Sequence, residues 1–190
     1  MNRNTIVIVS GLPRSGTSML MHMLEGGGMR VLTDEIRTAD DDNPEGYFEF
    51  ERVKQIETDR AWLEDAKGKA VKMISALLKY LPRNYSYRII FMIRKMEEIL
   101  ASQKRMLVRR NKPTDDVSDE KLSKLYLQHL EEIKTWLKEQ SNIDVIYMNY
   151  NEMLENSGEN VKKINDFLDN SLSGEDMVNI VDQTLYHQRK

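Results

Sequence analysis

An arginine, three hydroxyl side chains and two glycines come together in the sequence GLPRSGTS, residues 11–18, directly after an apolar run. Gly11 and Gly16 permit backbone conformations and close approaches that a side chain would obstruct. The residues after Gly16 are expected to open a helix, whose first N–H groups and dipole favour an anion. The polar side chains that could assist are Arg14, Ser15, Thr17 and Ser18. This combination predicts a phosphate-binding loop.

The loop lacks the lysine that nucleoside triphosphatases carry in G-x-x-x-x-G-K-[ST], because Thr17 stands at that position. Without the lysine, the charge of the β- and γ-phosphates is poorly neutralised. A variant nucleotide kinase or NTPase is an alternative, and it would need a replacement lysine and a Mg²⁺-binding aspartate at a strand end. The apolar runs end in KMIS, MIRK and YMNY instead.

GLPRSGTS resembles the 5′-phosphosulfate loop of the P-loop sulfotransferases, which keep a P-[KR]-S-G-T-[ST] core without the lysine. Their donor is 3′-phosphoadenosine 5′-phosphosulfate (PAPS), which leaves as 3′-phosphoadenosine 5′-phosphate (PAP). The resemblance implies that the donor is bound by Pro13, Arg14, Ser15, Gly16, Thr17 and Ser18. It also implies that Arg14 acts in catalysis by stabilising the bridging and leaving oxygens, and that no metal is required.

A second resemblance lies far along the chain. Sulfotransferases bind the 3′-phosphate with an arginine at a strand end and a serine in the following helix. FMIRKMEEILASQ supplies Arg94 and, eight residues later, Ser102, which places both on nearly one helical face. VIYMNYNEMLEN is similar to the family's strand followed by Y-E-D-L. It implies that Tyr150 contacts the adenine, although a half-buried core tyrosine fits the pattern equally well.

The acceptor must lose a proton, and the family implies two places for the base. Many cytosolic members carry K-x-H at the end of the third strand, where this chain has Lys72 and Ile74. Lys72 is expected to contact the sulfuryl group, whereas isoleucine cannot accept a proton. The tyrosylprotein branch instead uses a glutamate after the second strand, which corresponds to Glu35 and makes it the first candidate. The alternative carboxylates are Glu45, Glu49 and Asp34.

Apolar runs alternate with amphipathic segments along the chain, which is typical of a mainly parallel sheet covered by helices. Five strands are predicted, at 5–10, 29–32, 69–74, 87–93 and 143–148. Helices are predicted at about 15–25, 51–65, 95–110 and 118–140, with shorter ones from 150 onward. The expected fold is one α/β domain of the P-loop type, spanning 1–190, with a five-stranded parallel sheet flanked by helices. Ligands of such sheets bind beyond the carboxyl ends of the strands.

The bulk properties exclude several other classes of protein. A net charge of −3 and a pI near 5.7 give no field that favours nucleic acid. The chain has no cysteine and only three histidines, which excludes thiolate chemistry and argues against a metal site. The N-terminal apolar run is too short to span a membrane and lacks the form of a signal peptide, so a cytoplasmic protein with no membrane partner is expected.

The resemblance extends from residue 6 to about 187, and NPEGYFEFE at 43–51 is similar to microbial members, which indicates a compact microbial or viral form. It implies transfer of a sulfuryl group from PAPS to a hydroxyl, or an amine, of a small molecule, a glycan or a peptide. The acceptor and the oligomeric state are left open. The isoleucine at position 74 also leaves open a non-catalytic protein that binds PAP.

Overall fold

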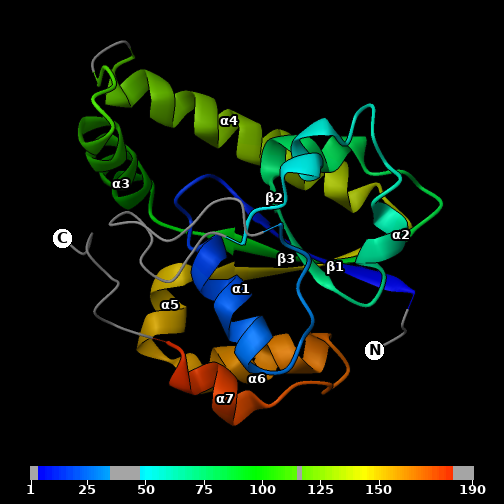
Figure 1. Ribbon diagram of the computed structural model, residues 1–190. Helices are drawn as coiled ribbons and strands as arrows, with labels where there is room; N and C mark the ends of the chain where they lie inside the picture. The colour runs from blue at the N-terminus through cyan, green and yellow to red at the C-terminus, as the bar shows by residue number, and fades with distance from the viewer. Residues whose placement is uncertain (1–3, 35–47, 115–116, 182–190) are drawn as a thin grey trace.

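The computed structural model describes residues 4–34, 48–114 and 117–181 of the 190-residue chain. A parallel sheet lies between two layers of helices in one α/β domain (Figure 1). The strands are β1 (Thr5–Gly11), β2 (Ala70–Ile74), β3 (Ser86–Ile93) and β4 (Ile143–Asn149). The α-helices are α1 (Thr17–Gly26), α2 (Leu63–Ala66), α3 (Met96–Arg109), α4 (Asp119–Lys138), α5 (Tyr150–Glu155), α6 (Ser157–Phe167) and α7 (Gly174–Asn179). Two 3₁₀ helices are η1 (Glu51–Gln55) and η2 (Ser75–Tyr80).

The strand order is β2–β1–β3–β4, and all pairings are parallel. Strand β1 is buried on both faces because its side chains alternate between two cores. Ile6 and Ile8 pack with residues of α2 and α4, whereas Val7 and Val9 pack with residues of α1, α5, α6 and α7. Burial on both faces explains why this strand is continuously apolar in sequence.

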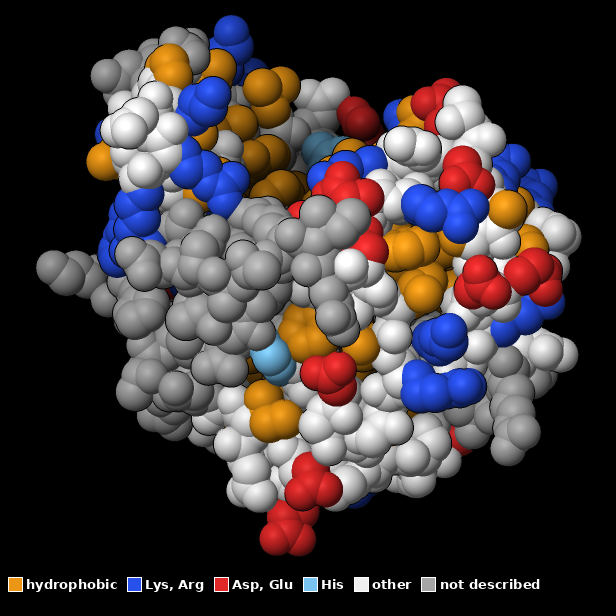
Figure 2. Space-filling model, viewed as in Figure 1, with side chains coloured by type: hydrophobic (Ala, Val, Ile, Leu, Met, Phe, Trp, Pro, Cys, Tyr) orange, Lys and Arg blue, Asp and Glu red, His pale blue; other side chains and the backbone are white. Residues whose placement is uncertain are grey.

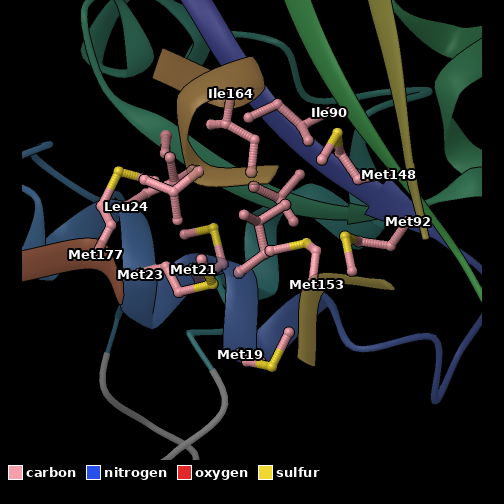
Figure 3. Packing of buried hydrophobic residues seen from close by; sticks show 14 of the residues in the cluster. Met19, Met21, Met23, Leu24, Ile90, Met92, Met148, Met153, Ile164 and Met177 are labelled. Atoms are coloured by element: carbon pink, nitrogen blue, oxygen red, sulfur yellow. The ribbon is translucent and has the colours of Figure 1, made fainter. Parts of the chain in front are cut away.

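The core beneath α1 is rich in methionine. Figure 3 shows methionines from α1, β3, β4, α5 and α7 gathered in this core. Methionine is flexible and fills irregular gaps between elements. The members of this cluster are Met19, Met21, Met23, Met29, Met92, Met148, Met153 and Met177. They seat α1 against the sheet directly after the glycine-bearing loop.

The strands end at a common edge of the sheet. Gly11 lies opposite Ile74 of β2 and Met92 of β3, and Ile93 lies opposite Asn149 of β4. This alignment brings the loop after β1, the start of η2 and the segment after β3 to one edge. Helix α3 leaves from this edge and forms a hairpin with α4 that extends beyond the sheet (Figure 1). The edge is where a parallel α/β sheet binds its ligands.

The prediction of a fifth strand at 29–32 is wrong. In this segment Val31 forms a single parallel bridge to Ala70, the first residue of β2. The segment makes two hydrogen bonds to Ala70, from Ala70 N to Arg30 O at 2.9 Å and from Leu32 N to Ala70 O at 2.8 Å. It therefore crosses the beginning of β2 and departs before a ladder can form, so the sheet has four strands.

The predicted helix at 51–65 is also broken. Only η1 and the single turn of α2 form, with a turn between them. Asp59 accepts a hydrogen bond from Ala61 N at 3.2 Å and ion-pairs with Arg52 at 2.7 Å. A side chain that satisfies the backbone locally competes with the helical hydrogen bonds. The other predicted strands and long helices are confirmed to within a few residues of their ends.

Candidate active site

The loop between β1 and α1 packs tightly against two neighbouring elements. A Cβ atom on Gly16, where φ is +98°, would lie 2.3 Å from Tyr150 Cδ2. A Cβ atom on Gly11 would lie 2.7 Å from the carbonyl oxygen of Met92. Both positions therefore require glycine because of protein groups next to the loop. The close approach expected at these glycines is made by β3 and α5.

Helix α1 begins immediately after Gly16, and its first N–H groups have no partner within the helix. Thr17 and Ser18 are half-buried at this helix start, and Pro13 is exposed. The sequence led us to expect the Ser15 hydroxyl among the groups open to a ligand, but the side chain is buried. Ser15 N–H donates to Leu12 O at 3.2 Å, and Ser15 Oγ has no hydrogen-bond partner in the part of the chain that the structure describes. Ser15 therefore supports the loop from within.

The structure joins the loop to the distant arginine–serine pair. Arg14 Nε donates to Ser102 Oγ at 2.9 Å. Arg94 Nη1 donates to the carbonyl oxygen of Arg14 at 3.1 Å. Arg94 directly follows β3, and Ser102 lies about two turns further along α3 on the same side. Arg14 thus contacts both Arg94 and Ser102, so the three residues lie together. Their roles in binding the donor stay predictions.

Arg94 is held by a buried network that the sequence analysis missed. Its Nε lies 2.9 Å from Glu98 Oε2, and the two side chains are 7% and 3% exposed. Asn151 Nδ2 donates to Glu98 Oε1 at 2.9 Å. A buried ion pair is tolerated when further hydrogen bonds satisfy its atoms, and Asn151 and Arg14 provide them. The spacing of four residues between Arg94 and Glu98 in a predicted helix was the signal available in the sequence.

Tyr150 lies beneath this network. The ring is 4% exposed, and Arg94 Cζ lies 4.3 Å from its centroid, in the geometry of a cation–π contact. The same ring packs against Gly16. Tyr150 thus lies in the core, and its contact with the adenine stays a prediction. The ring is a platform for Arg94 and for the loop.

Lys72 and Glu49 lie next to the start of α1. Lys72 Nζ donates to Ser18 Oγ at 3.1 Å and lies 3.9 Å from Glu49 Oε1. The exposed fractions of the Lys72 and Glu49 side chains are 13% and 23%. Lys72 therefore reaches the start of α1 from β2, and its contact with a sulfuryl group stays a prediction. The structure also brings Glu49 to the same place, whereas Glu35 and Glu45 lie outside the described residues.

The backbone around Glu49 is tied to residues 33 and 34. Thr33 Oγ1 donates to Glu49 O at 3.0 Å, and Asp34 N donates to the same oxygen at 3.3 Å. Asp34 Oδ2 accepts a hydrogen bond from Glu51 N at 2.6 Å. Asp34, an alternative candidate for the base, is therefore engaged in holding this backbone.

The end of β2 is occupied by Ile74 and Ser75. Ile74, at the position where many sulfotransferases carry histidine, is 47% exposed. Ser75 is buried, and its Oγ lies 2.8 Å from Nε2 of His129 on α4. Burial lowers the pKa of His129, with a smaller opposing effect from Glu132 and a lowering effect from Lys79. His129 thereby joins α4 to the end of β2.

In residues 4–34, 48–114 and 117–181, no cluster of three or more histidine, aspartate and glutamate side chains could hold a metal ion. No helix within these ranges combines the length and hydropathy of a membrane span.

The sequence profile of the family described as "Sulfotransferase domain" matches residues 4–190. No curated protein sequence matches the chain. Among solved structures, sulfotransferase STF9 from Mycobacterium avium superposes with a TM-score of 0.60 at 17% identity, covering 100% of this chain and 70% of that one.

Two other solved structures share the fold. The sulfotransferase domain of the Synechococcus PCC 7002 olefin synthase has a TM-score of 0.58 at 15% identity, covering 98% of this chain and 80% of its own. Mouse sulfotransferase SULT7A1, complexed with PAP, has a TM-score of 0.58 at 18% identity, covering 95% of this chain and 64% of its own. From the family match, the chain belongs to the sulfotransferase family, whose members are enzymes that transfer a sulfuryl group from PAPS to an acceptor.

Proposed function

We propose that this protein binds PAPS at the carboxyl ends of β1 and β3 and transfers its sulfuryl group in line to an acceptor hydroxyl located near the end of β2. The observation that carries this assignment is the contact of Arg14 with both Ser102 and Arg94. It joins a loop suited to a 5′-phosphosulfate and a cationic pair suited to a 3′-phosphate into one site.

The 5′ end of the donor is assigned to the start of α1. The backbone N–H groups of Gly16, Thr17 and Ser18 lie at the beginning of this helix, where an anion is favoured. The hydroxyls of Thr17 and Ser18 add donors at the same place. Pro13 shapes the exposed part of the loop, and Ser15 supports it from within.

The 3′-phosphate is assigned to Arg94 and Ser102. Glu98 and Tyr150 hold the guanidinium of Arg94 in one plane, so little side-chain freedom is lost when a phosphate binds. Ser102 accepts a hydrogen bond from Arg14 and retains its own O–H as a donor to a phosphate oxygen.

The transfer itself requires positioning and stabilisation of charge on the sulfuryl and leaving oxygens. Arg14 and Lys72 are the cations assigned to this role. Lys72 reaches the start of α1 through Ser18, and Arg14, which lies in the loop itself, donates its Nε–H to Ser102 of α3. The family's reaction does not need a triphosphate, which explains why Thr17 can replace the lysine of nucleotide-hydrolysing proteins.

The acceptor molecule is proposed to carry an apolar group next to the hydroxyl that receives the sulfuryl group. Ile133 and Leu137 of α4 are buried on the sheet, but Leu125, on the same face of the helix beyond His129, is 51% exposed. Ile74, at the end of β2, is 47% exposed. Figure 2 shows apolar side chains gathered over the α3–α4 hairpin, beside a place where histidine, basic and acidic side chains meet. An apolar acceptor would bury this surface.

The test is calorimetric titration of the wild type and Ser102→Ala with PAP and with ADP, which lacks the 3′-phosphate. A hydrogen bond to a charged group contributes about 1.5–3 kcal/mol. We therefore expect Ser102→Ala to weaken PAP binding by roughly ten- to a hundredfold. ADP binding is expected to be unchanged.

Ser123→Ala, a matched change on α4, should leave both affinities as in the wild type. Magnesium-dependent binding of ATP without binding of PAP would contradict the donor assignment and favour the nucleotide kinase or NTPase. Binding of PAP with no loss of sulfuryl group from PAPS would favour the non-catalytic alternative.

A further inference from the structure

We propose that the Glu49 carboxylate is the catalytic base and accepts the proton of the acceptor hydroxyl while the sulfuryl group is transferred. Glu49 is the candidate carboxylate that the described residues place beside Lys72. The inference rests on the proposed function, because it concerns the acceptor side of the same site.

Glu49 is connected to the loop after β1 through the side chain of Lys72. Lys72 Nζ donates to Ser18 Oγ at 3.1 Å, and the same nitrogen lies 3.9 Å from Glu49 Oε1. Ser18 belongs to the first turn of α1, where the 5′-phosphosulfate is assigned. The carboxylate therefore lies one lysine head group away from the end of the donor that carries the sulfuryl group.

The chain is anchored at Glu49 and just after it. Its carbonyl oxygen accepts hydrogen bonds from Thr33 Oγ1 at 3.0 Å and Asp34 N at 3.3 Å. Two residues later, Glu51 N donates to Asp34 Oδ2 at 2.6 Å. A base must be held in position relative to the reacting atoms, and these three bonds hold the backbone of Glu49 beside β2.

The accessibility of Glu49 also suits a base. Its side chain is 23% exposed, so an acceptor can reach a carboxylate that is partly shielded from water. Glu98, a second carboxylate near the loop, is 3% exposed and holds both Arg94 and Asn151. Ile74 occupies the position of the histidine base of many relatives and has no group that accepts a proton.

The proposed step is balanced. The acceptor oxygen forms a bond to the sulfur of PAPS, and its proton passes to a carboxylate oxygen of Glu49. The bond between that sulfur and the bridging oxygen of the 5′-phosphate breaks, and its electron pair stays on PAP. Lys72 lies between the two places where charge changes: the Glu49 carboxylate and the donor end of the loop at Ser18. Glu49 then returns the proton to solvent.

The experiment compares the wild type, Glu49→Gln, Glu49→Ala and Glu64→Gln. Glu64 is a matched control because it is also paired with a lysine, Lys67 at 2.7 Å, but on the exposed surface. PAP affinity is measured first by calorimetry. The single-turnover release of sulfuryl group from PAPS is then followed with phenol, with the more acidic 4-nitrophenol and with water as acceptors.

We expect Glu49→Gln to bind PAP within about twofold of the wild type, and to lose roughly 10²- to 10⁴-fold in the single-turnover rate with phenol and with water. The loss should be smaller with 4-nitrophenol, because its hydroxyl releases a proton more readily. Added formate should restore part of the rate of Glu49→Ala. Glu64→Gln should match the wild type.

An unchanged rate in Glu49→Gln would overturn the assignment. An equal loss with phenol and 4-nitrophenol, without rescue by formate, would overturn it in favour of a structural role for the ion pair with Lys72. Failure of the wild type to bind PAP would instead overturn the proposed function, and this result is visible before any rate is measured. A wild type that binds PAP but neither sulfates the phenols nor hydrolyses PAPS would overturn both the base and the enzymatic activity.

Discussion

Two neighbouring parts of the site hold their charges in different ways. The proposed donor end includes Arg14, Arg94, Glu98, Ser102 and Asn151, joined by direct bonds of 2.9 to 3.1 Å. The proposed acceptor end consists of Glu49 and Lys72, which lie 3.9 Å apart, and Lys72 also donates to Ser18 Oγ of the loop at 3.1 Å. The Arg94–Glu98 pair is almost completely buried, whereas Lys72 and Glu49 retain exposed surface.

The difference follows from what each end has to do. A donor is bound in one orientation, so its cations gain from being preorganised before it arrives. The acceptor end must exchange a proton, so its carboxylate needs access to the acceptor and then to water. The comparison predicts that substitutions at the donor end are costly for folding, and that substitutions at the acceptor end mainly affect the reaction.

Glu98→Ala should have the largest effect on stability. It leaves the Arg94 cation buried without its carboxylate, a change that costs about 3–5 kcal/mol in buried ion pairs. Glu49→Ala breaks a longer and partly exposed pair and should cost about 1 kcal/mol or less. Urea unfolding of both variants measures the difference. Equal costs would break the proposed contrast between the two ends.

Gly16→Ala should have the next largest effect, and Gly28→Ala is its matched control. Both glycines have left-handed backbone angles, with φ of +98° and +96°. A Cβ atom on Gly28 meets nothing within 4 Å, whereas one on Gly16 would lie 2.3 Å from Tyr150 Cδ2. Gly28→Ala should therefore cost about 1–2 kcal/mol for the backbone alone.

Gly16→Ala should cost about 1–3 kcal/mol more than Gly28→Ala, because the ring beneath Arg94 must move. The two free energies of unfolding, measured under the same conditions, sharpen the picture of a tightly packed donor end. Similar costs for the two variants would show that the loop and Tyr150 can separate easily.

The smallest effect concerns His129, which joins α4 to the acceptor end. Burial lowers the pKa of His129 in the folded protein below its ordinary value of 6.5. Between the two pKa values the unfolded chain binds more protons, so this contribution to stability is complete above pH 6.5 and is lost as the pH falls toward the folded pKa. Urea midpoints measured between pH 5 and pH 8 should fall less steeply on acidification in His129→Gln than in the wild type. Identical slopes would contradict the lowered pKa.

Much of the fold could be predicted because burial leaves a pattern in the sequence. The apolar runs at β1, β2, β3 and β4 and the stripes of α3 and α4 were located correctly. The segment at 29–32 has the same apolar character but pairs only at Val31, because its path crosses the start of β2. The helix predicted at 51–65 failed because the bonds of Asp59 to Ala61 and Arg52 compete with it. The spacing of apolar residues shows neither the direction in which a segment leaves the sheet nor the side-chain bonds that compete with a helix.

The resemblance to the family singled out the loop and the Arg94–Ser102 pair, and the structure brings both members of the pair to Arg14; their role in donor binding stays a prediction. The bond between Glu98 and Asn151 was missed because the two residues are 53 positions apart in the sequence and meet only in the folded chain. Ser75 and His129 were missed for the same reason, at a separation of 54 residues.

The sequence by itself determined that glycines, hydroxyls and an arginine stand at a helix start, a combination that favours an anion in any such fold. Only the tertiary structure decided how deeply each group lies: Ser15 and Tyr150 are buried, and Thr17 and Ser18 are half-buried at the start of α1. It also decided that Glu49 meets Lys72. The physical reason is that burial and partnership depend on chain segments that meet only at the shared edge of the sheet.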